Sequence, residues 1–432
     1  MTDRTARPPV ALAVVTTLFF MWGFITVLND VLIPHLKSVF TLSYTQAMLV
    51  QLIFFGAYFV MSLPAGKVID WVGYRTGIMI GLAVTGVGAL LFIPAAQTVS
   101  YAMFLGAFFV LASGITLLQV AANPYVSLLG DPRYASSRLN LAQALNSLGT
   151  TLAPKLGGVL ILSGTVLGAA ELARLAPADL IAYRAQQAAL VTGPYIGVAV
   201  TLFVLAFVVW IFRLPPLIEA TARADAQKHR VADVLRHRHV RLGVIAIFLY
   251  VGAEVSIGSF MINYVSMPSI GDFSEATAAG YVSLYWGGAM IGRFIGFALM
   301  RTLDPRRLLG SSAAMAGLLV VLTMVAQGHL ALWSVVAIGL FNSIMFPTIF
   351  TIAIEGMGTM TDMVSSLLIM AIVGGAIVPI VQGMLADHIG LQHAFVLPLA
   401  CYLFIVYYGF YGSLVRGTHA MSPTTAIPPG GR

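Results

Sequence analysis

LLQVAANPYVSLLGDPRYASSRLNLAQALNSLG, residues 117–149, begins in one apolar segment, turns through a short polar link and enters a second apolar segment. A buried amide without a partner costs on the order of several kcal/mol in a hydrocarbon setting. Carboxamide side chains inside these two segments must therefore bond to one another, face a wet cavity or bind a hydroxyl-rich ligand. Five carboxamides lie inside these two segments: Gln119, Asn123, Asn140, Gln143 and Asn146.

The composition is that of an integral membrane protein. Of the 432 residues, 59% are hydrophobic and only 9% are charged, whereas a soluble domain carries about 25% charged residues. The single cysteine, Cys401, excludes a disulfide framework and a cysteine-based metal site. The chain has no Walker loop, no GxSxG or HExxH sequence and no histidine spacing typical of a metal site. We therefore expect no enzyme activity, no metal and no cofactor.

Twelve apolar windows, each of about 20 residues or more, predict twelve membrane-spanning helices. The largest polar insertion, 214–240, divides these spans six and six, and a milder polar link at 169–189 is expected to lie at the membrane surface. The fold class is therefore all-α and integral to the membrane. The predicted spans are roughly 10–33, 45–69, 76–95, 100–128, 138–162, 190–213, 241–267, 277–301, 306–326, 330–356, 363–386 and 393–415.

The two halves of the chain echo each other, which predicts two pseudo-symmetric six-helix bundles. Pro124 to Pro154 covers a helix end, a tight loop and the next helix, and Pro347 to Pro379 repeats that layout. The pair Gly374–Gly375 takes the place in the second half that Gly149 has in the first. Many secondary transporters are built from two such halves, with the substrate site at their interface near the midplane. The expected divisions are an N-terminal bundle 1–213, a cytoplasmic linker 214–240, a C-terminal bundle 241–415 and a disordered tail 416–432.

Lysine and arginine predict the orientation of the chain. Outside the spans, only Lys37, Arg174 and Arg184 lie in odd-numbered loops, and the other basic residues lie in the tails and even-numbered loops. The positive-inside rule therefore places both termini and the 214–240 linker in the cytoplasm. The same asymmetry explains the net charge of +7 without any nucleic-acid partner.

The loop after the second span contains the pattern G-x-x-x-D-x-x-G-x-R, formed by Gly66, Asp70, Gly73 and Arg75. The glycines allow close helix approach and a tight turn, and the carboxylate can cap a helix or hold an arginine. Ion pairs that break and re-form at such a junction can latch one conformation. The pattern resembles the signature loop of the major facilitator superfamily, and a plain solvated turn is the alternative.

Three carboxylates lie inside or at the end of predicted spans. Asp30, beside Asn29, is a candidate for proton coupling, because an intramembrane carboxylate is costly and usually marks an ion or proton pathway. A cap at the end of a kinked helix is the alternative. Glu254 is expected near the midplane, where it either hydrogen-bonds a sugar, titrates or makes a structural bond. Glu355 is expected to form a gate with an arginine such as Arg293 or Arg138.

Several amides are candidates for substrate binding. Gln143 and Asn146 are three residues apart and share a helix face, as do Gln119 and Asn123, which are four apart. A single amide is more often a bond between helices, but two stacked pairs favour a polar cavity. The remaining candidates are Asn29, Asn263 and Asn342.

At these residues the chain resembles the fucose:proton symporter family of the major facilitator superfamily, and most of all its glucose/galactose branch. The resemblance covers nearly the whole chain. Its most specific parts are FFMWGFITVLNDVLIPHLK (19–37), QVAANPYVSLLG (119–130), SSRLNLAQALNSLGTTLAP (136–154) and YVGAEVSIGSF (250–260).

The resemblance implies roles for individual residues. It implies that Asp30, in the LND sequence, gains and loses a proton during transport, and that Gln143 and Asn146 contact the sugar. One departure matters, because the fucose carriers have a glutamate where this chain has Gln119. A neutral amide bonds to hydroxyls but carries no proton, so fucose is a weaker candidate and coupling falls to Asp30 with Glu254.

The sequence therefore predicts a monomeric carrier that imports a hexose of the glucose/galactose type together with protons, by alternating access. Sodium coupling is an alternative, because Asp30, Asn29 and nearby carbonyls offer hard oxygen ligands. A carrier of fucose or another monosaccharide, a non-sugar exporter and a non-transporting sugar sensor are further alternatives. The expected location is a bacterial inner membrane, with the lipid bilayer as the surrounding partner.

Overall fold

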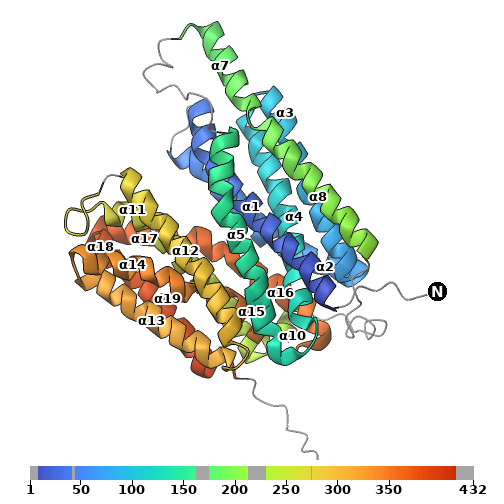
Figure 1. The fold of residues 1–432 in the computed structure, drawn as a ribbon, viewed down its shortest axis with the longest axis vertical. Coiled ribbons are helices and arrows are strands. Elements are labelled where there is room, and N and C mark those ends of the chain that lie inside the picture. The colour runs from blue at the N-terminus through green and yellow to red at the C-terminus, as the bar shows by residue number, and fades with distance from the viewer. Residues whose placement is uncertain (1–7, 41–43, 162–174, 213–229, 274, 415–432) are drawn as a thin grey trace, which may run out of the picture.

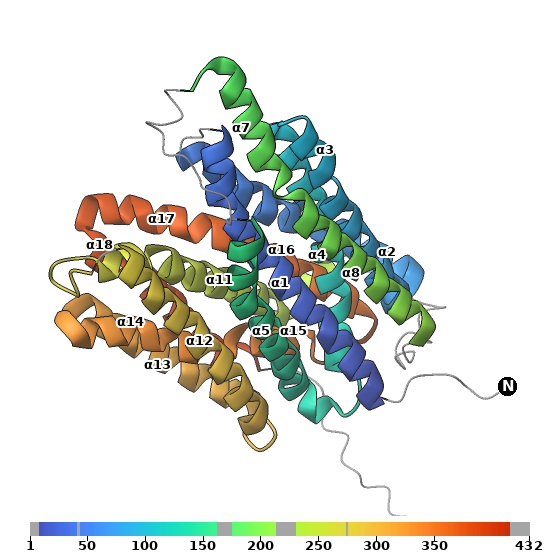
Figure 2. The same ribbon diagram turned by 45° about the horizontal axis from the view of Figure 1, so that its top comes forward.

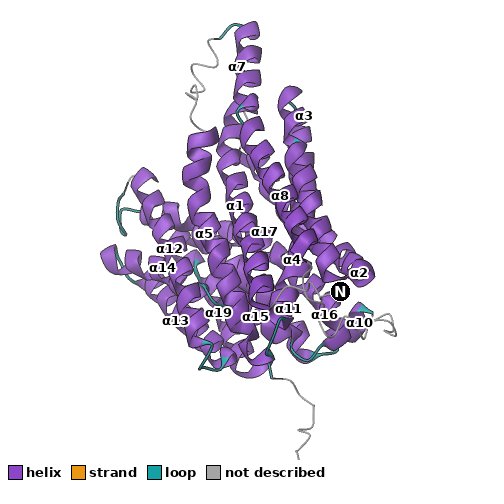
Figure 3. Ribbon diagram, turned by 45° about the vertical axis from the view of Figure 1, so that its right-hand side comes forward, coloured by secondary structure: helices purple, strands orange, loops and turns teal. Residues whose placement is uncertain are grey.

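The computed structural model describes residues 8–40, 44–161, 175–212, 230–273 and 275–414. Within those residues the regular structure is entirely helical (Figure 3). The tail 416–432 and the linker residues 214–229 lie outside the described residues, so the disorder expected for the tail stays a prediction.

The first half of the chain forms long apolar helices and a few short connecting ones. A 3-10 turn at Pro132–Tyr134 joins α4 to α5. The bounds are α1 Pro8–Phe40, α2 Tyr44–Leu90, α3 Phe92–Gln97, α4 Tyr101–Leu128, α5 Ala135–Ile161, α7 Pro177–Ala189 and α8 Thr192–Phe212.

The second half follows the same plan but breaks some of its spans into shorter pieces. Short 3-10 turns η3, Gly358–Met360, and η4, Ala371–Val373, flank α16, and the π-helical turn η5, Tyr408–Gly412, ends the last helix. The bounds are α10 Val231–Leu235, α11 Arg238–Val265, α12 Glu275–Leu299, α13 Pro305–Val325, α14 Gly328–Asn342, α15 Met345–Ile354, α16 Thr361–Met370, α17 Gly374–Ile389, α18 Leu391–Ala394 and α19 Val396–Tyr407.

These helices account for the twelve predicted spans. Nine helical stretches of the described residues are long and apolar enough to cross a membrane. One of them, Leu49–Gln97, holds two predicted spans, because Gly73 has a φ of 77° and folds the chain back there. Glycine suits that turn because it adopts positive φ at no steric cost. The other two predicted spans are α1, with 33 residues, and α5, with 27.

The segment expected at the membrane surface forms a helix in its described part. Its described part, α7, continues in line with α8 past the ends of the neighbouring helices (Figures 1 and 3). The break between the two helices is short, since Ala189 ends α7 and Thr192 begins α8. The helical spacing is therefore confirmed, and the position at the membrane surface stays a prediction.

The helices up to α8 and those from α11 onward form two groups that meet along two seams (Figures 1 and 2). At the first seam α5 packs against α12 and α15. At the second seam α16 packs against α2 and α4. A cavity that is lined by both groups of helices must therefore lie between these two seams.

Each group contains very close helix crossings centred on glycines. A Cβ atom on Gly149 of α5 would lie 2.2 Å from the Phe20 carbonyl oxygen of α1. In the second group, a Cβ atom on Gly374 of α17 would lie 2.0 Å from the Phe248 carbonyl oxygen of α11. Both glycines are therefore fixed by close backbone approach, and the echo of Gly149 in the second half has a structural counterpart.

We expect Gly149→Ala to destabilise the protein, because the added methyl group overlaps the α1 backbone. Overpacking of this kind costs about 1–3 kcal/mol, so the melting temperature of the detergent-solubilised protein should fall. Gly197→Ala on α8 is the matched control, since nothing lies within 4 Å of a Cβ atom there. Equal melting temperatures for the two variants would contradict a tight crossing of α1 and α5.

Candidate functional site

A cavity of about 500 Å³ lies between the two groups of helices. Its wall comes from α1, α2 and α5 on one side and from α11 and α12 on the other. The lining residues are Thr26, Val27, Val50, Gln51, Phe54, Phe55, Asn146, Ser147, Thr150, Thr151, Val255, Gly258, Ser259, Ser283, Trp286 and Arg293.

The polar part of this wall consists mainly of neutral groups, and α5 contributes four of them in two successive turns. Hydroxyls and amides both donate and accept hydrogen bonds. Aromatic rings from both halves stand among them, Phe54 and Phe55 from α2 and Trp286 from α12. Such a wall suits a small, neutral, hydroxyl-rich molecule with an apolar face.

Among the predicted amides, Asn146 lies on the cavity wall. Its Nδ2 donates to the Phe19 carbonyl oxygen at 2.9 Å, which ties α5 to α1. Its Oδ1 makes no hydrogen bond within the described residues and is not sealed from solvent. Asn146 therefore combines a structural bond with an acceptor that is free for a ligand.

The amides of α4 lie behind the wall, contrary to the expectation of a shared cavity-facing surface. Gln119 is 1% exposed and its Nε2 donates to the Tyr58 hydroxyl at 2.8 Å. Asn123 is fully buried, and its amide has no hydrogen-bond partner among the described side chains and backbone. Neither residue is among those that line the cavity.

Gln143 also lies outside the lining, although it is one turn from Ser147. Its side chain is buried, and its backbone carbonyl oxygen accepts a hydrogen bond from Nη1 of Arg293 at 3.3 Å. The pair Gln143 and Asn146 was predicted to share one role. The structure gives only Asn146 a place on the wall.

Asn342 is fully engaged with neighbouring tyrosines. Its Nδ2 donates to the Tyr285 hydroxyl at 2.8 Å, and its Oδ1 accepts from the Tyr402 hydroxyl at 2.7 Å. Its carbonyl oxygen accepts from the Tyr250 hydroxyl at 3.1 Å. These bonds make Asn342 a buried connection between α11, α12, α14 and α19, which is the alternative reading of a lone amide.

Glu254 and Asn263 lie on the same helix in very different surroundings. Glu254 is 9% exposed beside the lining residue Val255, and its carbonyl oxygen accepts from the Tyr285 hydroxyl at 3.4 Å. Asn263 is exposed in the last turn of α11 and does not line the cavity. Asn29 and Asp30 lie in α1 just after the lining residues Thr26 and Val27, but their side chains are outside the described part.

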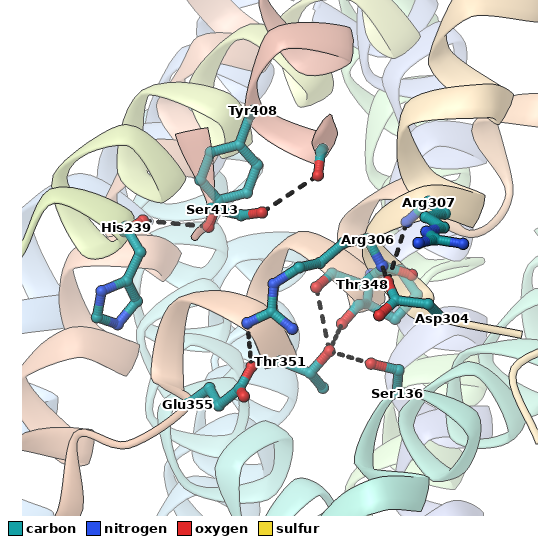
Figure 4. A network of polar contacts seen from close by, with 12 residues as sticks. Ser136, His239, Asp304, Arg306, Arg307, Thr348, Thr351, Glu355, Tyr408 and Ser413 are labelled. Carbon is teal, nitrogen blue, oxygen red and sulfur yellow. Dashed lines mark hydrogen bonds and ion pairs between the residues drawn. The ribbon is translucent and has the colours of Figure 1, made fainter. Parts of the chain in front are cut away.

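The two halves touch at the end of the molecule that carries residues 129–134 and 355–360, which we call the closed end. There the Ser136 and Thr351 hydroxyls are 2.6 Å apart and buried (Figure 4). The Ser137 hydroxyl donates to the Phe297 carbonyl oxygen at 2.8 Å. These contacts join α5 to α12 and α15, so the two halves are packed together at this seam.

Arg293 extends the same contact toward the cavity. Its Nη1 donates to the Ser147 hydroxyl as well as to Gln143 of α5. Its Nε donates to the Ser343 carbonyl oxygen of its own half at 3.2 Å. A gating role for Arg293 is therefore compatible with its position between the halves.

Glu355 pairs with a different arginine from those predicted. Its carboxylate lies 2.5 Å from Nη2 of Arg306 in the same half (Figure 4). Arg138 instead donates to the carbonyl oxygens of Val126, Ser127 and Asp131, at 3.1, 2.6 and 2.8 Å. A cation suits this position, because the last carbonyls of α4 have no partner within the helix. The predicted pairing of Glu355 with Arg138 or Arg293 is therefore wrong.

The loop after α4 contains a local ion pair. Nη2 of Arg133 lies 2.8 Å from the Asp131 carboxylate. Hydrogen bonds from Arg133 hold the pKa of the Asp131 carboxyl below its usual value. Asp131 also accepts a bond from the Arg133 backbone at 2.9 Å, so it begins the turn before α5.

The signature loop has the local geometry that its glycines predict. A Cβ atom on Gly66 would lie 2.1 Å from the Ser366 hydroxyl of α16, so Gly66 sits at the second seam between the halves. Gly73 makes the turn described above, and Nη2 of Arg75 donates to the Trp210 carbonyl oxygen of α8 at 2.5 Å. Asp70 is exposed. A latch role for this loop stays a prediction.

Most of the polar lining was not predicted, because hydroxyl side chains are hard to distinguish from apolar ones inside a helix. Thr150 and Thr151 both donate to the Ser147 carbonyl oxygen at 2.8 Å, which satisfies their hydrogens without any special sequence. The available signal was spacing. Gln51, Phe54 and Phe55 recur on one face of α2, as do Val255, Gly258 and Ser259 on α11.

No group of three or more histidine, cysteine or acidic side chains that could hold a metal occurs in the described ranges. Figure 4 draws His239, Asp304 and Glu355 apart from one another around Arg306. The cavity wall itself includes no carboxylate among the described lining residues.

Comparison with known proteins gives close relatives over almost the full chain. A model of the Major Facilitator Superfamily matches residues 10–371. The glucose/galactose transporter of Brucella abortus biovar 1 (strain 9-941) is 52% identical over 403 residues, which cover 93% of this chain and 94% of that protein. The L-fucose-proton symporter of Escherichia coli (strain K12) is 34% identical over 402 residues, which cover 92% and 91%.

A solved structure matches the fold closely as well. The crystal structure of a Major Facilitator Superfamily transporter, FucP, in the outward conformation has a TM-score of 0.84 and 33% sequence identity. The match covers 92% of this chain and 97% of that one.

We expect a cysteine on the cavity wall to react with a water-soluble maleimide several-fold faster than one at the closed end. The test uses Thr151→Cys, an exposed lining residue, and Ser136→Cys, which is 6% exposed. Both variants are made in a Cys401→Ser background, since Cys401 is the one native thiol. Faster labelling at position 136 would show that the closed end is open in the resting protein.

Proposed function

We propose, since this chain belongs to the Major Facilitator Superfamily, that it imports a monosaccharide of the glucose/galactose type in symport with protons. The superfamily fold places twelve membrane-spanning helices in two six-helix bundles, and this chain has that fold. Transport then follows from alternating access, in which the bundles rock about a central site.

The observation that carries the proposal is the neutral, hydroxyl- and amide-rich cavity between the two halves. A pyranose offers hydroxyls around its edge and C–H groups on its faces. Asn146 and the hydroxyls of Thr150 and Thr151 match the edge, while Trp286 and Phe55 match the faces. The volume of about 500 Å³ lies within the range of small-molecule pockets.

Two observations favour a glucose- or galactose-like hexose over fucose. The glucose/galactose transporter of Brucella is 52% identical, whereas the L-fucose-proton symporter of Escherichia coli is 34% identical. Gln119 is also neutral where the fucose carriers have a glutamate. Its amide is already bonded to Tyr58, so it shapes the bundle behind the cavity.

Proton coupling is proposed to rest on Asp30. This carboxylate follows the cavity-lining residues Thr26 and Val27 in α1, and a carboxylate inside a membrane helix is costly unless it serves an ion or proton pathway. Glu254 is a second candidate, because it is buried within electrostatic range of Arg293. Sodium is the alternative ion, with Asp30 and Asn29 as oxygen ligands.

The proposed orientation places the closed end in the cytoplasm. The described loops at that end carry Arg133, Arg301, Arg306 and Arg307, as the positive-inside rule requires. The cavity then faces outward, which agrees with the outward conformation of the matched structure. We accordingly propose a monomer in a bacterial inner membrane, with both termini cytoplasmic.

The proposed domains follow from the two groups of helices. Residues 1–213 form the N-terminal bundle and 241–415 the C-terminal bundle, and 214–240 is the cytoplasmic linker. Gly66, Asp70, Gly73 and Arg75 are proposed to act with Arg293 as gating residues, because Gly66 and Arg293 both lie where the halves meet. Arg138 and Glu355 are proposed to support the gate from within their own halves.

Two functions from other classes have less support. A drug exporter needs a more apolar cavity than one lined by Gln51, Asn146 and several hydroxyls. A sugar sensor that does not transport needs a path for its signal to another protein, and the described residues contain no folded domain outside the membrane bundle.

Asp30→Asn should abolish sugar-driven proton uptake while it leaves sugar exchange intact. The neutral amide no longer cycles a proton, but the cavity still binds sugar and the bundles still rock. The measurement is the alkalinisation of lightly buffered cells on sugar addition, paired with counterflow of labelled sugar in proteoliposomes. Sodium-stimulated uptake without any proton movement would replace the proton by sodium in the proposal.

Glucose or galactose should raise the melting temperature of the purified protein more than fucose or a hydrophobic cation does. Ligand that binds only the folded state stabilises it by RT ln(1 + [L]/Kd), about 2.7 kcal/mol when the ligand is at 100 times its Kd. A panel of monosaccharides and hydrophobic cations at equal concentration provides the comparison. Stabilisation by the cations alone would favour the exporter.

A further inference from the structure

Arg293 is the one charged side chain among the described residues that line the cavity. It is only partly exposed, and it forms no ion pair within the part of the chain that the structure describes. All its protein partners are carbonyl or hydroxyl oxygens. The hydrogen-bond partners of Arg293 are therefore all neutral, while the buried Glu254 carboxyl lies within electrostatic range of the guanidinium.

The five N–H groups of the guanidinium are used unevenly. Nε donates to Ser343 of its own half, and Nη1 donates to Gln143 and Ser147 of the other half. Nη2 donates to no atom of the described residues, yet it is not among the nitrogens sealed from solvent. Two N–H donors of this cavity-lining residue therefore remain without a partner among the described residues.

We propose that Nη2 of Arg293 binds a hydroxyl of the transported sugar, so that one guanidinium contacts the substrate and also holds α5 at the closed end. The inference rests on the proposed function, because it takes a hexose as the ligand. Arginine suits this task, since its planar fork presents donors in fixed directions and stays charged at every relevant pH. Bonds from a charged donor to a neutral acceptor are also stronger than neutral ones.

These two contacts of Arg293 link binding of the sugar in the cavity to the contact that joins α12 to α5. A sugar bound at Nη2 and the α5 oxygens bound at Nη1 share one rigid group, so sugar binding acts on the contact between the halves. Because Ser147 also lines the cavity, that contact lies directly beside the bound molecule. Binding can shift an equilibrium only through such state-dependent contacts.

The test measures the Kd of glucose and of a series of monodeoxyglucoses by titration calorimetry. The proteins are the wild type, Arg293→Gln, Arg293→Lys and Arg301→Gln. Arg293→Lys keeps the positive charge but has a single nitrogen. This variant can still be measured if Arg293→Gln does not fold. Arg301→Gln is the matched control, because Arg301 is exposed beyond the end of α12 and does not line the cavity.

We expect both Arg293 variants to bind glucose about tenfold or more weakly, as for loss of a charge-assisted hydrogen bond. One deoxy sugar, the one lacking the contacted hydroxyl, should bind the wild type and the Arg293 variants with the same Kd. Arg301→Gln should bind like the wild type. This pattern would assign the hydroxyl to Nη2.

Two results would overturn the inference. Wild-type affinity in both Arg293 variants would show that the sugar does not touch this residue. An equal loss for every deoxy sugar would show that Arg293 acts only on the gate. If the wild type bound no hexose at all, the proposed function would fall together with this inference, so the two failures can be told apart.

Discussion

A polar side chain inside an apolar helical bundle is costly to bury without a partner, and this constraint sorts many of the described polar residues into distinct groups. Hydroxyls such as Thr116 and Thr323 donate to carbonyl oxygens one turn earlier and then pack as apolar groups. Asn342 is satisfied by the hydroxyls of Tyr285 and Tyr402. Asn146 is left with a free acceptor on the wall of a cavity. A polar cavity is thus where the remaining groups meet water or a ligand.

Close glycine crossings place those remaining groups. Gly149 brings α5 against α1, and Asn146 and Thr150 lie beside it on the side that faces the other half. Gly374 brings α17 against α11 in the second half, but the neighbouring polar network around Asn342 is sealed by tyrosines. The same crossing therefore supports an open polar surface in one half and a rigid buried network in the other. The cavity is asymmetric although the fold repeats.

The spans followed from the sequence, because hydrophobic length is a local property of the chain. Each predicted span has a helix, and Gly73 marked the turn inside α2. The site was harder to predict, since hydropathy does not tell which way a helix is rotated. Gln119 and Asn123 share a face, as their spacing implies, but that face is buried against other helices. The predicted arginine partner of Glu355 differed for a similar reason. Arg306 reaches Glu355 only because α13 packs against α15, and the sequence does not show that packing.

The contacts that close one end of the cavity are weak individually, and a carrier needs that weakness. The Ser136–Thr351 and Ser137–Phe297 bonds join neutral groups, and each such bond contributes only about 0.5–1.5 kcal/mol net. Moving a two-state equilibrium from 1:99 to 99:1 takes a differential affinity of about 5.5 kcal/mol, so a few bonds of this size are within the reach of a bound sugar and a coupled ion. Arg293, the charged group that bridges the halves among the described residues, is bound to neutral carbonyl and hydroxyl oxygens, so its contact across the halves is also free of an ion pair there.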